Sequence, residues 1–585
     1  MRKFTRNMIL AATAAVVPAV PTLAAPYVSG ITVTGTTVSF ILNENADSLS
    51  LSVNGGAPSA LPATRGAQSF TLASPTDTFS LTASKVDANG WSIPNGTTVA
   101  TQVNALSIDS NGSALNLISD GTNLLNRFNS PRGVSINNNP RAGALFGTAY
   151  VANSASGTAG GRAVGDGIYA LHADQSDRFG FGDAAQTGGI TAWATTPSAS
   201  APFRLHVGRD NTLFIADFSD LTGTVWRMGP NLTNGTNVLA GVGGPTALPA
   251  GQNHGSSTAV YTEGSIATGD LVLYTLDEDL TDAQFGSAIS NNRNSLWRYE
   301  LGSNETPSTV TPTRINANNV LLPLATSDMD RGLVDGKFYL SQNRGIGAVQ
   351  VNDTSLIVLN PDGTTAFNSL EASRALLGDL AASDILKNII AMDVSDDQKW
   401  MVLMLNNSKV CVVPLINGIP DIANRLVVDS GSINSGRDIA FDAANNIHYV
   451  SSGQAIYRVL SPGGTTVAVT SWDGTNFSFV LNPATTLLKG DFNFDGEVLD
   501  SDISLFVSAL TGDFASLVAQ FPTRSEADFT FIGDFNSDGE VLDSDITGFV
   551  AALLGGGGRV AAIPEPAALG LLAPLGLLLG RRRRA

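Results

Sequence analysis

A short hydrophobic phrase with the character of a β-strand recurs six times across the middle of this 585-residue chain. The copies read GIYAL at 167–171, TVWRM at 224–228, SLWRY at 295–299, SLIVL at 355–359, KVCVV at 409–413 and AIYRV at 455–459. Successive copies begin 57, 71, 60, 54 and 46 residues apart. Self-similarity at such a spacing is typical of repeat architectures. We therefore expect several similar sheet units, and not one ordinary core.

A second pattern precedes two of these strands, RLHVGRDNTLFIAD at 204–217 and RDIAFDAANNIHYV at 437–450. Polar Asp-Asn and Asn-Asn turns between apolar runs indicate hairpins. Several strands per unit, repeated about six times, predict a β-propeller of about six blades over 105–485. An array of β-sandwiches would explain the same strands. The phrasing resembles the broad NHL and gluconolactonase-like propellers.

Composition favours a mainly β protein. The chain has 60 Gly and 26 Pro, and hydrophobic residues make up 43% while charged residues make up 14%. It can bury large cores, and frequent tight turns suit short strands better than long helices. Residues 28–42 and 79–87 alternate between apolar and polar side chains. We expect a small immunoglobulin-like β-sandwich at 25–104, ahead of the propeller.

The clearest internal repeat lies near the C-terminal end, where 490–510 and 533–553 are identical at 17 of 21 positions. Each copy carries oxygen ligands at the offsets of a twelve-residue calcium loop. The predicted ligands are Asp491, Asn493, Asp495, Glu497 (through its backbone carbonyl) and Asp502 in the first copy, and Asp534, Asn536, Asp538, Glu540 and Asp545 in the second. Clustered carboxylates repel one another unless a cation neutralises them, so Ca²⁺ is the expected cofactor.

An apolar stripe at i, i+3, i+4 and i+7 follows each loop and predicts a short amphipathic helix. Over 486–555 the sequence resembles a type I dockerin module, whose fold is a pair of calcium-loop-plus-helix units. The chain departs from that pattern at Leu499 and Leu542, where the family usually carries Asn or Asp, and at Asp500-Ser501 and Asp543-Ser544, where Ser-Thr often reads the partner. The module either docks onto a cohesin-like protein or uses calcium to fold a small stalk.

The N-terminal segment is expected to direct export. Basic residues at the start, an apolar run over 8–17 and small residues up to Ala25 match a secretory signal peptide, which we place at 1–24. An N-terminal membrane helix is the alternative reading, although the apolar run is short for about 30 Å of hydrocarbon.

The last residues combine three features in a fixed order. Pro564, Glu565 and Pro566 precede an uncharged segment at 567–580 and the arginines Arg581, Arg582, Arg583 and Arg584. Fourteen residues cover about 21 Å as a helix, less than a membrane core, so the tail would pause in the inner membrane with its arginines in the cytoplasm. The arrangement at 556–585 resembles the PEP-CTERM sorting signal. That resemblance implies processing by an exosortase in a Gram-negative bacterium that makes extracellular polysaccharide.

Charge and cysteine content exclude several classes of function. The formal net charge is −18, and loss of both terminal segments, which carry seven basic and no acidic residues, lowers it to −25. Such a chain is a poor ligand for nucleic acid. One cysteine, Cys411, excludes an internal disulfide framework, and its apolar strand predicts a buried hydrophobe.

No residues are predicted to be catalytic. Asp217, Asp277, Glu278, Asp279 and Asp393 lie near expected strand ends and would surround a central metal if the propeller were a hydrolase. Surface turns explain them equally well. Trp226 and Trp297 share a position in the repeated phrase, which favours core packing over sugar stacking.

Two functional hypotheses follow. The first is a non-catalytic, calcium-binding protein of the outer surface or matrix, whose propeller binds polysaccharide or protein. The second is a metal-dependent hydrolase of polysaccharide or lactones. An acidic cluster at the centre of the propeller would favour the hydrolase, and its absence would favour binding.

Overall fold

A computed structural model describes the chain between residues 26 and 555, with gaps. The described residues are 26–88, 116–117, 123–182, 184–190, 201–218, 225–239, 257–280, 293–304, 310, 312–316, 321, 325–344, 352–405, 409–428, 435–452, 456–461, 464–481, 489–490, 492, 498, 502–520, 526–535 and 540–555. The chain divides into two units, Met1–Leu481 and Asn482–Ala585, each considered on its own. Within the described ranges, no helix is long and apolar enough to cross a membrane.

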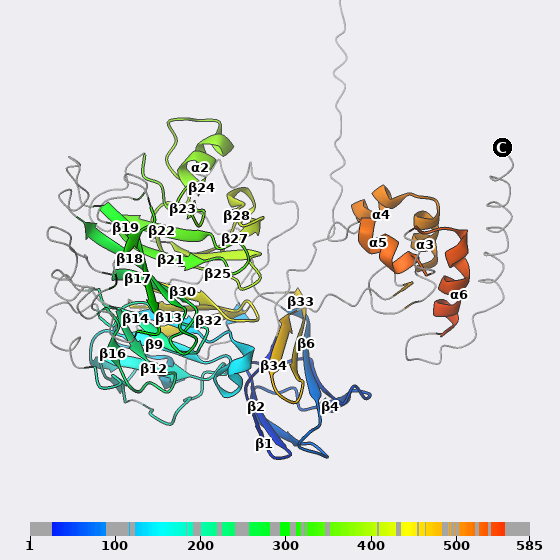
Figure 1. Ribbon diagram of the computed structural model, residues 1–585, viewed down its shortest axis with the longest axis horizontal. Coiled ribbons are helices and arrows are strands. Elements are labelled where there is room, and N and C mark those ends of the chain that lie inside the picture. The colour runs from blue at the N-terminus through cyan, green and yellow to red at the C-terminus, as the bar shows by residue number, and fades with distance from the viewer. Residues whose placement is uncertain are drawn as a thin grey trace, which may run out of the picture. The chain divides into compact units, whose positions relative to one another are not determined.

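The prediction of a mainly β protein is confirmed, because the first unit consists largely of small antiparallel sheets (Figure 1). Each copy of the repeated phrase lies in the third strand of a separate sheet. These third strands are β12 (Gly167–Leu171), β15 (Val225–Met228), β19 (Arg293–Gly302), β23 (Leu356–Leu359), β27 (Val410–Ile416) and β32 (Ile456–Ser461). The second strands are β9 (Ala149–Asn153), β14 (Leu213–Ala216), β18 (Leu271–Leu280), β22 (Phe338–Arg344), β26 (Trp400–Leu405) and β31 (Ile447–Ser451).

The first strands of the six sheets lie against one another in chain order. They are β8 (Pro131–Ile136), β13 (Leu205–Val207), β17 (Ser257–Glu263), β21 (Ala325–Arg331), β25 (Ile389–Val394) and β30 (Gly436–Phe441). Each contacts the next, and β30 contacts β8, so the sheets form a closed circle that we call the ring. Outer strands complete five of the sheets: β16 (Thr236–Asn237), β20 (Thr313–Arg314), β24 (Thr365–Asn368), β29 (Leu426–Val428) and β7 (Asn116–Leu117).

β7 has a special position, because it precedes the first sheet in the sequence but pairs with β32 of the last sheet. The last sheet therefore joins residues from both ends of the ring. Smaller elements decorate the ring: the hairpin β10 (Gly157–Ala159) with β11 (Arg162–Val164), strand β28 (Ile419–Pro420), the helix α2 (Ser369–Leu377), and the short 3-10 helices η1 (Leu124–Asn126), η2 (Pro140–Leu145) and η5 (Ile422–Asn424).

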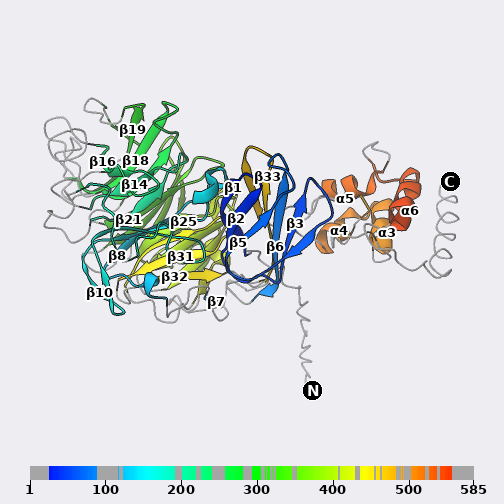
Figure 2. The same cartoon turned by 90° about the horizontal axis from the view of Figure 1, so that it is seen from below.

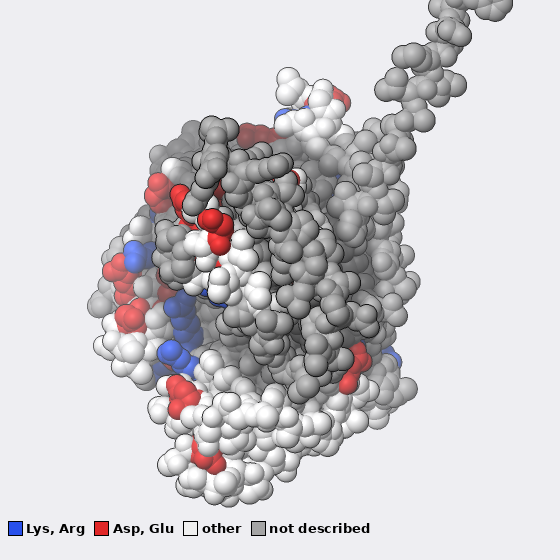
Figure 3. All heavy atoms as spheres, turned by 90° about the vertical axis from the view of Figure 1, so that its right-hand side faces the viewer, with Lys and Arg blue, Asp and Glu red and all other residues white. Residues whose placement is uncertain are grey.

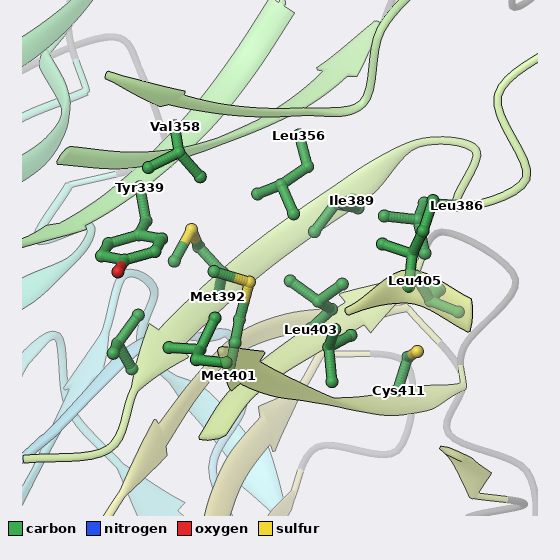
Figure 4. Close-up of a cluster of buried hydrophobic side chains, with 14 of the residues drawn as sticks. Tyr339, Leu356, Val358, Leu386, Ile389, Met392, Met401, Leu403, Leu405 and Cys411 are labelled. Atoms are coloured by element: carbon green, nitrogen blue, oxygen red, sulfur yellow. The ribbon is translucent and has the colours of Figure 1, made fainter. Parts of the chain in front are cut away.

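Apolar cores fill the spaces between neighbouring sheets. Figure 4 shows one of them, where Tyr339 and Leu356 of the fourth sheet face Met401, Leu403 and Cys411 of the fifth. Because both faces of these sheets are covered, β23 and β26 are continuous apolar runs and do not alternate. The prediction that Cys411 is a buried hydrophobe is confirmed, since its exposed fraction is 0% and burial raises the pKa of its thiol to about 12.

Two further sheets form a sandwich around one apolar core (Figure 2). One contains β1 (Val28–Thr34), β2 (Thr37–Leu42) and β5 (Gly66–Thr71), and the other has the order β34 (Phe477–Leu481), β33 (Gly464–Trp472), β6 (Phe79–Ala88), β3 (Ser48–Val53), β4 (Ser59–Leu61).

The sandwich corrects one expected boundary. Residues 464–481 were assigned to the propeller at 105–485, but β33 pairs with β6 from Trp472 opposite Phe79 to Gly464 opposite Ala88. Without β33, β6 would be an edge strand with unpaired backbone groups. The sandwich is therefore built from segments that precede and follow the ring in the sequence.

The second unit contains the helices α3 (Ile503–Leu510), α4 (Phe514–Gln520), α5 (Glu526–Gly533) and α6 (Ile546–Gly555), with the 3-10 turn η7 (Asp543–Asp545) before α6. α3 and α6 occupy the two positions where the sequence predicts amphipathic helices. Phe506 and Phe549, at equivalent positions of the two copies, stack with ring centroids 4.0 Å apart and an interplanar angle of 17°. The two stripes thus share one core.

Candidate functional site

A cavity of about 510 Å³ lies where the first strands of all six sheets converge. Its walls come from these strands and from turns that follow them, and we call it the central cavity. Its polar lining residues include Asn137, Asn138, Arg141, Arg204, His206, Arg209, Tyr261, Thr262, Asp328, Asp330, Arg331, Asp393, Asp396 and Asp438. The strands approach closely here: a Cβ at Gly133 would lie 2.3 Å from the carbonyl oxygen of Phe203, so β8 requires glycine.

Arg204 lies at the deep end of the central cavity with an exposed fraction of 3%. Its Nε is 3.2 Å from Oδ1 of Asp328 and 3.4 Å from Oδ1 of Asp438. Its Nη1 donates to the carbonyl oxygen of Thr258 at 2.9 Å, and its Nη2 donates to that of Ile390. One guanidinium from the second sheet therefore contacts the third, fourth, fifth and sixth sheets.

Four aspartates connect neighbouring first strands. Each accepts a hydrogen bond from a backbone N–H of the next first strand around the ring. The pairs are Asp328 with Met392 (2.9 Å), Asp330 with Val394 (2.9 Å), Asp393 with Phe441 (2.6 Å) and Asp438 with Val134 (2.8 Å). The first strands have no further strand on their inner edge, so their N–H groups need such acceptors. The carboxylates therefore join the sheets as well as lining the cavity.

Asp330 and Asp393 lie close enough for each to affect the ionisation of the other. Two buried carboxylates at one site repel each other, which favours protonation of one of them. Burial raises the pKa of Asp330 to about 7, and repulsion by Asp396 adds to this effect. Burial, followed by repulsion from Asp330, raises the pKa of Asp393 well above its ordinary value. Both shifts favour the protonated form of the pair.

The deeper carboxyl groups also differ from free aspartate. Burial raises the pKa of Asp328, while the Arg204 guanidinium offsets part of this rise. Burial and repulsion by Asp328 raise the pKa of Asp438. A full positive charge thus faces two carboxyl groups whose ionisation is held back by burial.

His206 and Tyr261 form an aromatic part of the cavity lining. The rings of His206 and Tyr261 have centroids 4.4 Å apart. Burial lowers the pKa of His206 to about 4, so the imidazole is neutral at pH 7. Arg331 is held by the carboxylate of Glu263 and by the hydroxyl of Tyr274, to which its Nη1 donates at 2.8 Å. Its charge is therefore already paired.

The residues expected around a central metal are dispersed. Asp393 lies in the central cavity, but Asp217 accepts from the indole N–H of Trp226 at 2.9 Å, and Asp277 accepts from the Ser257 hydroxyl at 3.0 Å. Both are fully buried away from the cavity lining. The side chains of Glu278 and Asp279 lie outside the described residues. The tryptophan prediction is confirmed, because Trp226 and Trp297 are 9% and 8% exposed within the ring.

Sequence reasoning did not single out Arg204, Asp328, Asp330 or Asp438. A usable signal is present for Arg204 and Asp438, because each is a charged residue next to apolar ones and both lie inside the second pattern, which the sequence analysis interprets as a hairpin. The signal is weaker for Asp328 and Asp330, because β21 reads ATSDMDR and is not apolar. A charged residue in a strand covered on both sides requires a partner, and that partner comes from another sheet.

The predicted calcium ligands are described in part. Asp502, Asp534, Glu540 and Asp545 are described, whereas Asp491, Asn493, Asp495, Glu497, Asn536 and Asp538 lie outside the described residues. Asp502 and Asp545 are fully buried, and each accepts a backbone N–H at 2.7 Å, from Phe492 and Phe535 respectively. The last ligand position thus closes the same turn in both copies. Within the described ranges, no group of three His, Cys, Asp or Glu residues is placed to hold a metal, so calcium binding stays a prediction.

The sorting residues Pro564, Glu565, Pro566 and Arg581 to Arg584 lie outside the described residues, as does the signal peptide at 1–24. On the face seen in Figure 3, blue and red residues are mixed among uncharged ones on the described part of the surface. The described part of this face therefore shows no single continuous acidic patch.

Comparison with known proteins gives fold similarity at low identity. No model of a protein family matches the chain, and no curated protein matches it. A protein of unknown function from Bacteroides thetaiotaomicron is 11% identical, with a TM-score of 0.32 over 75% of this chain and 98% of its own. A gluconolactonase from Xanthomonas campestris is 11% identical, with a TM-score of 0.34 over 64% and 95%. The major allergen of Malassezia sympodialis is 8% identical, with a TM-score of 0.27 over 48% and 77%. At these TM-scores the similarity carries no functional argument.

Proposed function

We propose that this chain is an exported calcium-binding protein that presents a six-bladed β-propeller at the outer surface or in the extracellular matrix of a Gram-negative bacterium. The ring would be the propeller, and its central cavity would bind the ligand. The observation that supports this proposal is the convergence of all six first strands on one cavity of about 510 Å³. Concave sites of this size with a few convergent polar groups are the usual form of a small-ligand site.

The chemistry of the cavity favours a hydroxyl-rich ligand, such as the terminal units of a matrix polysaccharide. The pair Asp330–Asp393, whose pKa values are raised by burial, supplies carboxyl groups, and Tyr261 adds a phenol. Thr262 lines the same cavity, is 2% exposed, and has a hydroxyl that makes no hydrogen bond to the described residues. A ligand hydroxyl is a suitable partner for it.

Binding is favoured over catalysis because the acidic residues already have a structural task. Asp330 and Asp393 each use one oxygen to hold the next first strand. A protein that needed them only for chemistry would not require those bonds.

The test is a pull-down of the purified protein with extracellular polysaccharide from an exopolysaccharide-producing Gram-negative bacterium, with and without chelator. Release of reducing ends is assayed in the same tube. We expect binding without release, and at least about tenfold weaker binding by the variant Asp330→Asn/Asp393→Asn. Lys399→Gln, at an exposed pair with Asp397, is the control. Wild-type protein that does not bind, or a double variant that binds equally well, would refute the cavity as the site.

A second candidate is the hydrolase of polysaccharide or lactones. The specific observation in its favour is the proximity of Asp330 and Asp393, whose raised pKa values suit a general acid beside a general base. Aspartates converge on the cavity, but within the described ranges no three His, Cys, Asp or Glu residues are placed to hold the metal of this metal-dependent hydrolase. Release of reducing ends or lactone opening by the wild type, lost in Asp393→Asn, would put this candidate first.

The remaining parts of the proposal concern delivery. The loops at 486–555 would bind Ca²⁺, and the module would serve as a stalk or dock onto a cohesin-like protein. An exosortase-type protease would process the tail after transient contact with the inner membrane. Asp491→Ala with Asp534→Ala should abolish the calcium-dependent gain in helical circular dichroism, and deletion of 563–585 should change where the protein is found. An unchanged calcium response of the double variant would refute calcium binding by these loops, and an unchanged location after the deletion would refute sorting by the tail.

A further inference from the structure

Arg132 and Arg437 lie near the start of two adjacent first strands, β8 and β30. Both precede the first residues of their strands that line the central cavity, Val134 and Asp438. The N–H of Val134 donates to Asp438 at 2.8 Å, which holds the two strands side by side. The arginines are therefore neighbours outside the cavity, and both are half-buried.

A serine hydroxyl and the carbonyl oxygen behind it hold the guanidinium of Arg132, and we call this arrangement the seat. Its Nε donates to Oγ of Ser154 at 3.3 Å, and that hydroxyl donates in turn to the carbonyl oxygen of Ser130 at 3.3 Å. The N–H of Ser154 also donates to the same carbonyl at 2.9 Å. The seat fixes the Nε edge of the guanidinium and leaves its two Nη groups for other partners.

The last sheet repeats this seat with its own residues. Nε of Arg437 donates to Oγ of Ser452 at 2.8 Å, and that hydroxyl donates to the carbonyl oxygen of Ser435 at 3.3 Å. Ser435 stands two residues before its arginine, as Ser130 does before Arg132. The same arrangement in two adjacent sheets indicates a built feature and not two incidental surface arginines.

The two charges are not neutralised within the described part of the chain. No carboxylate there forms an ion pair with Arg132 or Arg437, in contrast to Arg204, which meets Asp328 and Asp438. Burial, followed by repulsion from Arg437, lowers the pKa of Arg132 to about 10. Burial, followed by repulsion from Arg204, lowers the pKa of Arg437. Both groups stay protonated at pH 7, so two half-buried cations repel each other.

We propose that Arg132 and Arg437 form a binding site for an oxyanion group, either a carboxylate or a phosphate or sulfate, carried by a ligand that reaches this end of the ring. Guanidinium groups match planar and tetrahedral oxyanions through paired N–H bonds, and an anion between two of them removes their repulsion. Uronic acid units supply the carboxylate, and phosphate or sulfate esters supply the alternative. The site is separate from the central cavity and does not depend on its proposed role.

The test uses the full-length protein in low salt, titrated calorimetrically with sodium glucuronate, inorganic phosphate, sodium sulfate and, as the uncharged probe, glucose. We expect at least one oxyanion to bind, to raise the Tm, and to bind more weakly as ionic strength increases. Arg132→Gln/Arg437→Gln should weaken binding by about tenfold or more, since each loses charge-assisted hydrogen bonds. Arg298→Gln/Lys399→Gln removes two positive charges from exposed pairs and should bind as the wild type does.

The outcomes separate the sources and decide the proposal. Glucuronate binding alone identifies a carboxylate site, whereas phosphate or sulfate binding alone identifies an ester site. Absence of binding by all three anions overturns the proposal, and so does equal binding by the double glutamine variant. If that variant does not fold, Arg132→Gln and Arg437→Gln are tested separately, and unchanged affinity in both single variants also overturns the proposal.

Discussion

At the scale of single residues, the centre of the ring depends on Arg204. Its guanidinium is buried between Asp328 and Asp438 and also holds two carbonyl oxygens. Removal of one partner from a buried ion pair leaves an uncompensated charge, which costs far more than the loss of an exposed pair. Arg204 therefore matters for stability before any question of ligand binding.

We predict that Arg204→Met lowers the free energy of unfolding of the first unit by about 3–5 kcal/mol, because two buried carboxyl groups lose their counter-ion. Chemical denaturation followed by tryptophan fluorescence measures this. Arg298→Met, which removes an exposed pair with Glu300, is the matched control and should change stability by about 0.5 kcal/mol or less. Equal effects of the two substitutions would contradict the central role of Arg204.

A second prediction concerns the pair Asp330–Asp393. Its pKa values lie above the ordinary value in the folded chain, so the folded state binds more protons than the unfolded state between about pH 4 and about pH 7. The free energy of unfolding should therefore fall as the pH rises through this window. Asp393→Asn removes a titrating carboxyl group whose pKa is raised in the folded chain, so it should flatten the slope. Urea unfolding across this pH range measures it.

The control for this experiment is Asp362→Asn. Asp362 is exposed, and hydrogen bonds from Thr364 lower its pKa, so its contribution to pH dependence has the opposite sign and lies at lower pH. This variant should keep the wild-type slope between pH 4 and pH 7. If Asp393→Asn also keeps it, the ionisation of Asp393 is not the cause of the slope.

At the scale of elements, the sequence predicted the strands well and their partners poorly. The repeated phrase marks a third strand in all six sheets, because strands covered on both faces are rich in apolar side chains. Asp393 is among the residues that the sequence singles out, because it stands near an expected strand end. The backbone N–H groups that Asp328, Asp330, Asp393 and Asp438 contact belong to the next sheet, and the local pattern does not identify such distant partners.

The helices of the second unit illustrate a prediction that local spacing carries well. The stripes after each predicted calcium loop predicted α3 and α6, and a shared core is what two stripes of this kind produce. Phe506 and Phe549 stack on each other at equivalent positions of the duplication. Their contributions should therefore be nearly the same.

We predict that Phe506→Ala and Phe549→Ala each destabilise the second unit by about 3–5 kcal/mol, since each removes a buried aromatic ring and leaves its partner without a stacking face. Thermal unfolding followed by helical circular dichroism of the full chain measures both. Leu542→Ala, at a side chain that is 41% exposed, is the control with a small effect. Effects that differ severalfold between the two phenylalanines would contradict the symmetry.

At the scale of the whole first unit, segments that precede the ring in the sequence pair with segments near or after its end in two places. β7 completes the last sheet, and β33 with β34 completes the sandwich beside β6. No local signal predicts this, because β33 alternates in the manner of any half-buried strand and its partner lies almost 400 residues earlier in the chain. Residues 464–481 were therefore assigned to the ring, although they belong to the sandwich.

We predict that a chain ending at residue 481 keeps the Tm of the first unit, whereas a chain ending at residue 463 loses several degrees. The shorter chain lacks β33 and β34, which exposes the edge of β6 and the apolar core of the sandwich. Differential scanning calorimetry and limited proteolysis compare the two. Equal melting of both chains would show that the sandwich is complete without the strands after the ring.

The position of β33 and β34 also has a mechanical consequence. In a protein held by its C-terminal end, tension enters the first unit at Leu481, the last residue of β34, and reaches β33 before any strand of the ring. Under this force the β33–β34 hairpin would separate from β6 and extend, while the sheets of the ring stayed folded. The sandwich would then unfold before the ring, so a pull on the C-terminal end would leave the central cavity intact.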